Sequence, residues 1–487
     1  MIRSRIFRTV FLLLTFTCLS YSSYYPNFNL INEEPLNIVS ENFLSVALDC
    51  SNIEGRFSDF NLSDPYLTSL VKHLSPMYFR VGGTYADRIV FSDDVSSFGK
   101  VGLADITFLA SDYLKLYQFT QNAEVQLIYD LNSLLRNEDG TWNSSNAAEM
   151  IKFSSDHQMN VVWELGNEPD LYKSIYKTHV DATQLAKDYK ILRNMLNQYE
   201  IYNSSYLVGI DMFDVGGSQA NQEYLSNFLS GASDVVHAVT WHQYYFPGKS
   251  ATEELFLSPS TYNYLEQRIG VVKNVVSKSG SGNKIWLGET SSAYNGGAKG
   301  MSDKFIATFL WLDKLGLGAK LGLDVIIRQT IFHDNYALID NNYVPNPDWW
   351  VSVLYKQLVS STVLSLTSSE NSESPVRMYA HCAKKTDLWD TSAVVLFGLN
   401  VNGTSNSIFT WSGFEYDKTN VYSYELTFDG SLYSQNIKLN DQVLSVSPNG
   451  DLPDLTPKVN EDLENYLMPP QSLIFLVFTK TDIDACI

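Results

Sequence analysis

The chain has 487 residues, and its 34 Lys and Arg against 54 Asp and Glu give a formal net charge of −20. This acidic balance argues against a nucleic-acid-binding protein and against a broadly basic surface for a polyanion. With 45% hydrophobic and 13% aromatic residues, the chain can bury a large core, so its length suits a barrel plus a smaller domain rather than a disordered protein.

The first 23 residues have the pattern of a secretory signal peptide. Three arginines precede an apolar run at 10–16, and serines follow at positions 20, 22 and 23. The run is too short for a membrane span and no later stretch is long enough, so we expect no transmembrane segment. The mature chain should be secreted, and we expect it in the extracellular space, the extracellular matrix or lysosomes.

The glycosylation sequons and the cysteines are consistent with secretion. N-glycosylation sequons begin at Asn61, Asn143, Asn203 and Asn402. Cys18 leaves with the signal peptide, and Cys50 lies on an apolar strand. In an oxidising compartment we expect the other two cysteines, Cys382 and Cys486, to form a disulfide. A bridge that uses Cys50 is the alternative.

Beyond the signal peptide, residues 24–40 contain an apolar patch at 36–39 that indicates an extra strand. Between 41 and 358, short apolar runs alternate with amphipathic helical segments. The runs lie at 43–48, 77–81, 125–129, 161–165, 206–210, 238–244, 285–288 and 324–327, and helices are expected at 64–74, 146–155, 182–198, 264–277 and 302–315. Eight such units predict an α/β fold, a (β/α)8 TIM barrel, and a doubly wound open sheet is the alternative.

From residue 359 to 487 the helical pattern stops. Short apolar strands separated by turn residues follow, at 376–380, 393–401, 421–428 and 472–478. This pattern predicts a C-terminal β-sandwich domain.

Polar residues stand at the end of each predicted barrel strand. They are Asp49, Thr84, Asp130, Asn132, Asn167, Glu168, Asp211, His242, Tyr244, Glu289, Arg328 and Gln329. One such residue alone is as well explained by a cap or a buried hydrogen bond. Since the carboxyl ends of barrel strands meet at one mouth, the recurrence after every strand predicts an active site there.

Two of these residues are glutamates at strand ends. Glu168 follows the run 161–165, where Pro169 cannot continue a strand, and Glu289 ends the run 285–288. Two facing carboxylates suggest glycoside hydrolysis; if they lie about 5 to 5.5 Å apart the mechanism is retaining. Glu289 would then be the nucleophile and Glu168 the acid/base, with a pKa raised by the charge of Glu289.

Neighbouring polar groups fit the same chemistry. Asn167 is placed to bind the sugar 2-hydroxyl, and Tyr244 to hydrogen-bond Glu289. His242 is a candidate substrate contact and is equally explained as a packed imidazole. The sequence has no His-Glu-x-x-His and no paired Cys/His spacing, so we expect no metal and no cofactor.

Several motifs resemble the heparanases, which are endo-β-glucuronidases of glycoside hydrolase family 79. The similarity runs from about residue 40 to the C-terminus and is carried by residues 164–169, 240–245, 286–294, 311–317 and 485–487. The resemblance implies a retaining enzyme with Glu168 as acid/base and Glu289 as nucleophile, a Cys382–Cys486 disulfide, and an N-terminal segment that adds a strand to the β-sandwich. By motif position it places substrate contacts at Asp49, Thr84, Asn167, Tyr244, Lys249, Tyr294, Gly296, Gln329 and Tyr336.

Two departures from the heparanases stand out. Only about 16 residues separate Phe91 from the next predicted helix, so we expect no excised segment and no activation cleavage. The stretch 209–220 has no arginine where the family has a basic cluster. Residues 167–170, 242–246 and 327–331 also resemble the leech-type hyaluronidases of the family, and unsulfated hyaluronan needs fewer cations.

The leading hypothesis is therefore a secreted, retaining endo-β-glucuronidase acting on a glycosaminoglycan of the heparan sulfate type. Hyaluronan is the second candidate polymer. The chain could also be an exo-β-glucuronidase or a non-catalytic glycosaminoglycan-binding protein, and the presence of both glutamates argues against the binding protein. The sequence does not indicate an oligomeric state.

Overall fold

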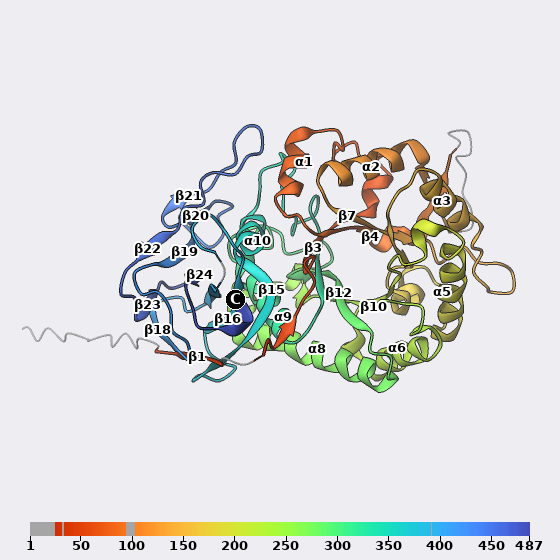
Figure 1. Cartoon of the computed structure of the whole chain (residues 1–487). Coiled ribbons are helices and arrows are strands. Elements are labelled where there is room, and N and C mark those ends of the chain that lie inside the picture. The colour runs from red at the N-terminus through yellow and green to blue at the C-terminus, as the bar shows by residue number, and fades with distance from the viewer. Residues whose placement is uncertain (1–24, 32–33, 94–102, 391) are drawn as a thin grey trace, which may run out of the picture.

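The computed structural model of the chain describes residues 25–31, 34–93, 103–390 and 392–487. A barrel surrounded by helices lies beside a large C-terminal sheet (Figure 1). The predicted signal peptide, 1–23, lies outside the described residues, as does most of the segment that follows Phe91. In the part of the chain that is described, no helix has the length and apolar character needed to span a bilayer.

Eight parallel strands form the barrel, in the spatial order β8, β7, β4, β3, β14, β12, β10, β9. Their bounds are β3 Leu44–Asp49, β4 Tyr78–Gly82, β7 Gln126–Leu131, β8 Val162–Leu165, β9 Val208–Met212, β10 Ala238–Gln243, β12 Lys284–Thr290 and β14 Val325–Arg328. The outer strands β8 and β9 meet through a parallel bridge between Trp163 and Leu207. All eight overlap the predicted strands, and the TIM barrel, rather than an open doubly wound sheet, is confirmed.

Helices surround the barrel and bury their apolar faces on it. They are α1 Pro65–Lys72, α2 Ala110–Asn122, α3 Ser145–Asp156, α4 Tyr172–Ile175, α5 Ala182–Leu196, α6 Gln219–Ala232, α7 Glu253–Leu257, α8 Pro259–Ser279, α9 Ala307–Lys320 and α10 Pro347–Leu358. The prediction of a helix from residue 302 was wrong at its start, since α9 begins at Ala307. The Ser302 hydroxyl is instead bonded to Ser292 Oγ and to the Ala298 amide, and so stabilises the preceding loop.

In the described parts of the chain the C-terminal sheet has twelve strands, and two of them come from the N-terminal segment. They are β1 Asn27–Ile31, β2 Asn37–Ile38, β15 Val359–Ser368, β16 Val376–Ala383, β17 Val394–Asn400, β18 Ser407–Ser412, β19 Val421–Phe428, β20 Ile437–Leu439, β21 Gln442–Val443, β22 Lys458–Asn460, β23 Asn465–Met468 and β24 Ser472–Phe478. β1 lies between β15 and β18, as the red strand among blue ones in Figure 1. The apolar patch at 36–39 forms only the two-residue strand β2.

Strand β17 is buried on both faces, which explains its continuous apolar sequence. Val395 and Phe397 belong to the core shared with the barrel helices, whereas Val394 and Leu396 belong to a second core inside the sheet domain. Helix α9 packs against β16 and β17 and is itself buried over nearly its whole length. The two domains therefore share one continuous apolar interface.

A disulfide between Cys382 and Cys486 ties β16 to the C-terminal end, and Cys50 is a buried free cysteine. The remaining strands form two small parallel pairs on the barrel loops. They are β5 Ile89–Ser92 with β6 Ile106–Leu109, and β11 Phe246–Pro247 with β13 Ala293–Tyr294.

The contact of α9 with the sheet depends on Gly316. A Cβ at this position would collide with the Tyr379 ring. We expect Gly316→Ala to lower the free energy of unfolding by about 2 to 3 kcal/mol, because overpacking displaces the ring. Gly270→Ala is the matched control: its Cβ would meet no atom within 4 Å on α8, so it should stabilise the protein by about 0.5 to 1 kcal/mol. Equal effects of the two changes in thermal unfolding would contradict this packing.

Candidate active site

The barrel lumen changes from apolar to charged along its axis. One apolar cluster at its N-terminal half draws on all eight strands, through Ala47, Tyr78, Ile128, Val162, Val208, Ala238, Trp286, Val325 and Ile327. Because side chains alternate along a strand, Arg80 lies on the same face as Tyr78, and Glu164 on the same face as Val162. The layer above the apolar cluster is therefore ionisable.

Arg80 is fully buried at the centre of that layer. Its Nε donates to Glu164 (2.7 Å), and one terminal nitrogen donates to Glu289 Oε2 (3.0 Å). The other terminal nitrogen donates to Asp211 (2.5 Å) and to Asn167 Oδ1 (3.1 Å). Burial opposes the charge of Arg80, but the carboxylates, Asp211 first, outweigh it and raise the pKa of the guanidinium well above its ordinary value.

Glu168 lies on a tight turn after β8. Gly166 has φ 80° and Glu168 has φ 54°, a left-handed conformation that is uncommon for a residue with a Cβ. The Glu168 amide donates to the Asp211 carbonyl (2.9 Å), and the Leu171 amide donates to the Glu168 carbonyl (2.8 Å). Pro169 begins the 3-10 turn Pro169–Leu171. The side chain of Glu168 is thereby directed from the strand end into the barrel mouth.

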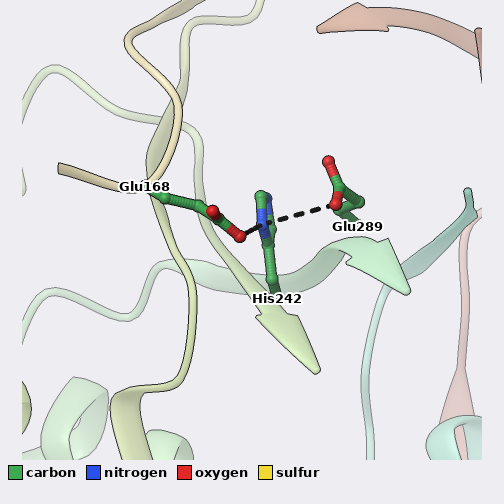
Figure 2. Close-up of side chains that lie close together, drawn as sticks. All are labelled: Glu168, His242 and Glu289. Carbon is green, nitrogen blue, oxygen red and sulfur yellow. Dashed lines mark hydrogen bonds and ion pairs between the residues drawn. The ribbon is translucent and has the colours of Figure 1, made fainter. Parts of the chain in front are cut away.

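Glu289 lies at the end of β12, across the lumen from Glu168. The Tyr244 hydroxyl donates to Oε1 (2.8 Å), and Arg80 donates to Oε2 (3.0 Å). Glu289 is 7% exposed and Glu168 8% exposed. One carboxylate oxygen of each lies within 4.8 Å of the other, and Figure 2 shows the two side chains with His242 between them.

His242 bonds a carboxylate with each ring nitrogen. Nδ1 lies 2.9 Å from Glu168 Oε1, and Nε2 lies 2.7 Å from Asp211 Oδ1. A neutral imidazole carries a single N–H, so His242 is charged whenever both carboxylates are ionised. Burial opposes this charge, but Asp211 and Glu289 outweigh burial and raise the pKa of His242 well above its ordinary value.

The carboxylates of the lumen differ in acidity. Burial raises the pKa of Glu168 to about 7, although the hydrogen bond to His242 opposes the rise. Burial, supported by the charge of Asp211, also raises the pKa of Glu164 to about 7. The pKa of Asp211 is shifted in the opposite direction. Burial would raise it, but the charges of Arg80 and His242 outweigh burial and lower it. Glu168 can therefore hold a transferable proton near neutral pH, as a general acid requires.

The other predicted contacts fall into three groups. Gln329 donates to Asp49 (2.9 Å), and the Tyr336 ring stacks on Tyr244 with centroids 6.2 Å apart, so these residues adjoin the Glu289 side of the mouth. Tyr294 packs edge-on against Phe213, and the Gly296 carbonyl, in a turn with φ 77°, accepts two hydrogen bonds from Asn335. Thr84 and Lys249 are exposed on the loops after β4 and β10.

Besides Thr84, two residues of the predicted ring lie away from the central cluster. Arg328 donates to Asp348 of α10 (2.6 Å), and Asn132 donates to the Ile89 carbonyl (3.0 Å). Sequence reasoning in turn missed Arg80 and Glu164. Both interrupt apolar strand runs with a charge, and that interruption was the available signal, since a charged residue is rarely buried without a partner.

Among the described residues, two groups of side chains have a donor set suited to a cation: Glu168, His242 and Glu289, and Asp130, Glu164 and Asp211. In both groups a cationic side chain, His242 or Arg80, already lies among the carboxylates. Asp130 accepts no hydrogen bond within the described residues, and Arg80 lies 3.8 Å from it. Burial raises the pKa of Asp130 well above its ordinary value, so this group suits proton storage better than metal binding.

Residues 47–316 match the N-terminal domain of glycosyl hydrolase family 79. The chain is 32% identical to heparanase of Mus musculus, covering 93% of both chains, and 35% identical to hyaluronoglucuronidase of Hirudo nipponia, covering 92% of this chain and 96% of the relative. Among solved structures, α-L-arabinofuranosidase of Thermotoga maritima aligns with a TM-score of 0.68 at 13% identity, over 93% of this chain and 99% of the other. The chain belongs to glycoside hydrolase family 79, and it is a glycoside hydrolase.

Proposed function

We propose that this chain is a retaining endo-β-glucuronidase that cleaves internal β-glucuronide linkages of a glycosaminoglycan. The observation that carries the proposal is the pair Glu168 and Glu289, which lie on opposite sides of the barrel mouth with carboxylate oxygens within 4.8 Å. That separation fits a carboxylate that attacks the sugar directly and leaves too little room for a water between the two groups. The names of the heparanase and hyaluronoglucuronidase relatives support a uronic-acid polymer as substrate.

The reaction proceeds in two steps in this proposal. Glu289 attacks the anomeric carbon of the glucuronic acid residue while Glu168 gives its proton to the departing glycosidic oxygen, which leaves a glycosyl ester on Glu289. Glu168, now ionised, then takes a proton from a water that attacks the same carbon and frees Glu289. Tyr244 and Arg80 orient Glu289, and His242 stabilises the ionised form of Glu168 between the two steps.

Hyaluronan is the second candidate substrate, and the rim beside Glu168 favours it. Residues 209–220 contain Asp211 and Asp214 and neither lysine nor arginine. Arg268 from α8 lies 3.4 Å from Asp214 and is engaged by it. Asp211 is paired with Arg80 and His242, and Asp214 with Arg268. This stretch therefore offers no free cation to closely spaced sulfates, whereas hyaluronan brings only one carboxylate per disaccharide.

We also propose that the protein is secreted and glycosylated. Asn61, Asn143 and Asn203 are exposed and Asn402 is half-buried, and the Cys382–Cys486 disulfide suits an oxidising compartment. Expression in a secretory host followed by glycosidase treatment and mass spectrometry would show which sequons carry glycans.

The substrate is tested by parallel digestion of hyaluronan, heparan sulfate and a small aryl β-glucuronide, with sizing of the products. Large fragments from one polymer support endo action and identify the polymer, whereas release of single sugars indicates an exo-glucuronidase. The anomeric configuration of the first product, read by NMR, tests retention. No turnover of the three substrates would contradict the proposal and leave a binding protein.

The pH dependence follows from Glu168. Its pKa of about 7, raised by burial, means that the general acid is protonated below about pH 7 and loses its proton above. We expect kcat/KM to fall as pH rises through about 7, by roughly tenfold per pH unit once Glu168 is mostly ionised. In Glu168→Gln this alkaline limb should be missing. An unchanged limb in the variant would assign the titration to another group.

A further inference from the structure

Asp87 lies outside the proposed machinery, yet it is fully buried beneath the turn that carries Glu168. It belongs to the 3-10 turn Thr84–Arg88 after β4. Its Oδ1 accepts from the Ser133 amide (2.8 Å) and the Ser133 hydroxyl (3.1 Å). Its Oδ2 accepts from the Asn167 amide (3.1 Å) and the Tyr172 hydroxyl (2.8 Å). One carboxylate thus joins the loops that follow three neighbouring barrel strands.

The bond from the Asn167 amide bears directly on Glu168. It anchors the residue between Gly166 and Glu168, both of which have positive φ. Such a conformation persists in a residue with a Cβ only when the surroundings determine it. A Cβ at Gly166 would collide with the hydroxyls of Tyr172 and Ser133, so the turn is packed directly onto the groups that bond Asp87.

We propose that Asp87 is a positioning residue for the acid/base, holding the Gly166–Glu168 turn so that the Glu168 carboxyl reaches the glycosidic oxygen. The proposal rests on the proposed function, because it takes Glu168 as the proton donor. Within the described residues Asp87 bonds the amide of Asn167 and no atom of Glu168, so it acts through the backbone. A displacement of a catalytic group by about 1 Å is enough to cost on the order of 10²-fold in rate.

The Gly166–Glu168 turn requires the two acceptor oxygens of the Asp87 carboxylate. Asp87→Asn keeps the size of the side chain but replaces one acceptor oxygen by an NH2 group. If the NH2 faces Asn167, two donors oppose each other and the turn is released. If it faces Ser133, the same conflict moves to the Ser133 amide and hydroxyl. Tyr172→Phe removes only one of the four donors and should act in the same direction more weakly.

The test is a leaving-group series. The substrates are aryl glycosides of a glucuronic-acid-terminated fragment of whichever polymer the wild type cleaves, with phenol or 2,4-dinitrophenol as leaving group. Phenolate leaves poorly, since phenol has a pKa near 10 like tyrosine, and needs the proton from Glu168, whereas dinitrophenolate leaves without it. We expect Asp87→Asn to lower kcat/KM by about 10²-fold for phenol and by less than about threefold for dinitrophenol.

Asp313→Asn is the matched control. Asp313 is also fully buried and also accepts from a tyrosine hydroxyl, Tyr379 (2.6 Å), but it lies where α9 meets the sheet domain. Asp313→Asn should lower the stability of the protein, but it should change kcat/KM equally for the phenol and the dinitrophenol substrates. Glu168→Gln is the benchmark: if it shows no leaving-group preference, the proposed function fails. If Glu168→Gln shows the preference and Asp87→Asn loses both substrates equally or neither, the positioning role is overturned.

Discussion

Replacement of Glu289 by alanine should lower kcat/KM by about 10⁴- to 10⁶-fold, the scale on which enzymes lose activity with their covalent nucleophile. Without the carboxylate no glycosyl ester forms, although the protein keeps its Arg80 and Tyr244 donors. Added azide fits the space left by the side chain and should restore turnover, giving an α-glycosyl azide because attack comes from the nucleophile side. With Glu168→Ala, azide should instead trap the ester and give the β-azide.

The control for this change lies in the sheet domain. Glu425 on β19 accepts a tyrosine hydroxyl, from Tyr466 at 2.8 Å, much as Glu289 accepts from Tyr244. Glu425→Ala should leave kcat/KM within about twofold, since it removes the same group far from the mouth. A β-azide from the Glu289 variant would mean that the two glutamates have the opposite roles. Activity of this variant without azide would refute Glu289 as the nucleophile.

Arg80→Met should be the most destabilising single change in the lumen. It leaves Glu164, Asp211 and Glu289 buried without their guanidinium partner, and removal of one partner from a buried ion pair costs about 3 to 5 kcal/mol. Turnover should also be lost, since Glu289 loses the donor to its Oε2. Arg80→Lys should recover only part of both, because one ammonium cannot bond three separate carboxylates in fixed geometry.

The stability that Arg80→Met loses should depend on pH, because the pKa values of the lumen carboxylates differ between the folded and unfolded states. In the natural protein Arg80 and His242 lower the pKa of Asp211, so the stability that Asp211 contributes is present above its unfolded pKa and is lost as pH falls. Without Arg80 the folded pKa values of the clustered carboxylates move upward, those of Glu164 and Asp130 from values that burial already raises, so more stability is lost as pH rises. Thermal unfolding should therefore show a larger deficit of Arg80→Met at pH 7.5 than at pH 5.

Arg377→Met is the comparison for this experiment. Arg377 pairs with Asp313 at 2.6 Å and is nearly buried, but it lies on β16 and faces α9 rather than the lumen. We expect a loss of stability with activity retained at permissive temperature. If Arg377→Met abolishes turnover as completely as Arg80→Met, the effect of Arg80 is one of folding alone.

The barrel was predictable because its strands are buried on both faces, and such strands are continuous apolar runs that end abruptly. The ends of the runs at 161–165 and 285–288 also placed Glu168 and Glu289 at one mouth, where the structure brings them together. Their catalytic roles stay predictions. The charge of Arg80 interrupts its apolar run and so marks the residue, but its role was not predictable, because it depends on four partners on other strands that no local pattern contains.

The other features were harder to predict from the sequence, because they depend on loops and on strand pairing between distant segments. Asp87 lies five residues beyond β4 in a turn without periodicity, so nothing in the sequence marks it apart from other loop acids. The strand β1 pairs with partners more than 330 residues away, and the more apolar patch at 36–39 drew the prediction instead. Arg328 was placed in the ring by its position at a strand end, yet it bonds α10 on the outside of the barrel.

The pairing of β1 constrains how the protein can be made. Asn27 lies beside Thr410, 383 residues later, so at about 5 to 20 residues per second β1 waits roughly 20 to 80 s for that neighbour to leave the ribosome. The strand β24, which lies between β17 and β19, emerges later still. The barrel can therefore form during synthesis while the first strand stays unpaired, and the sheet is completed only when both ends of the chain are available.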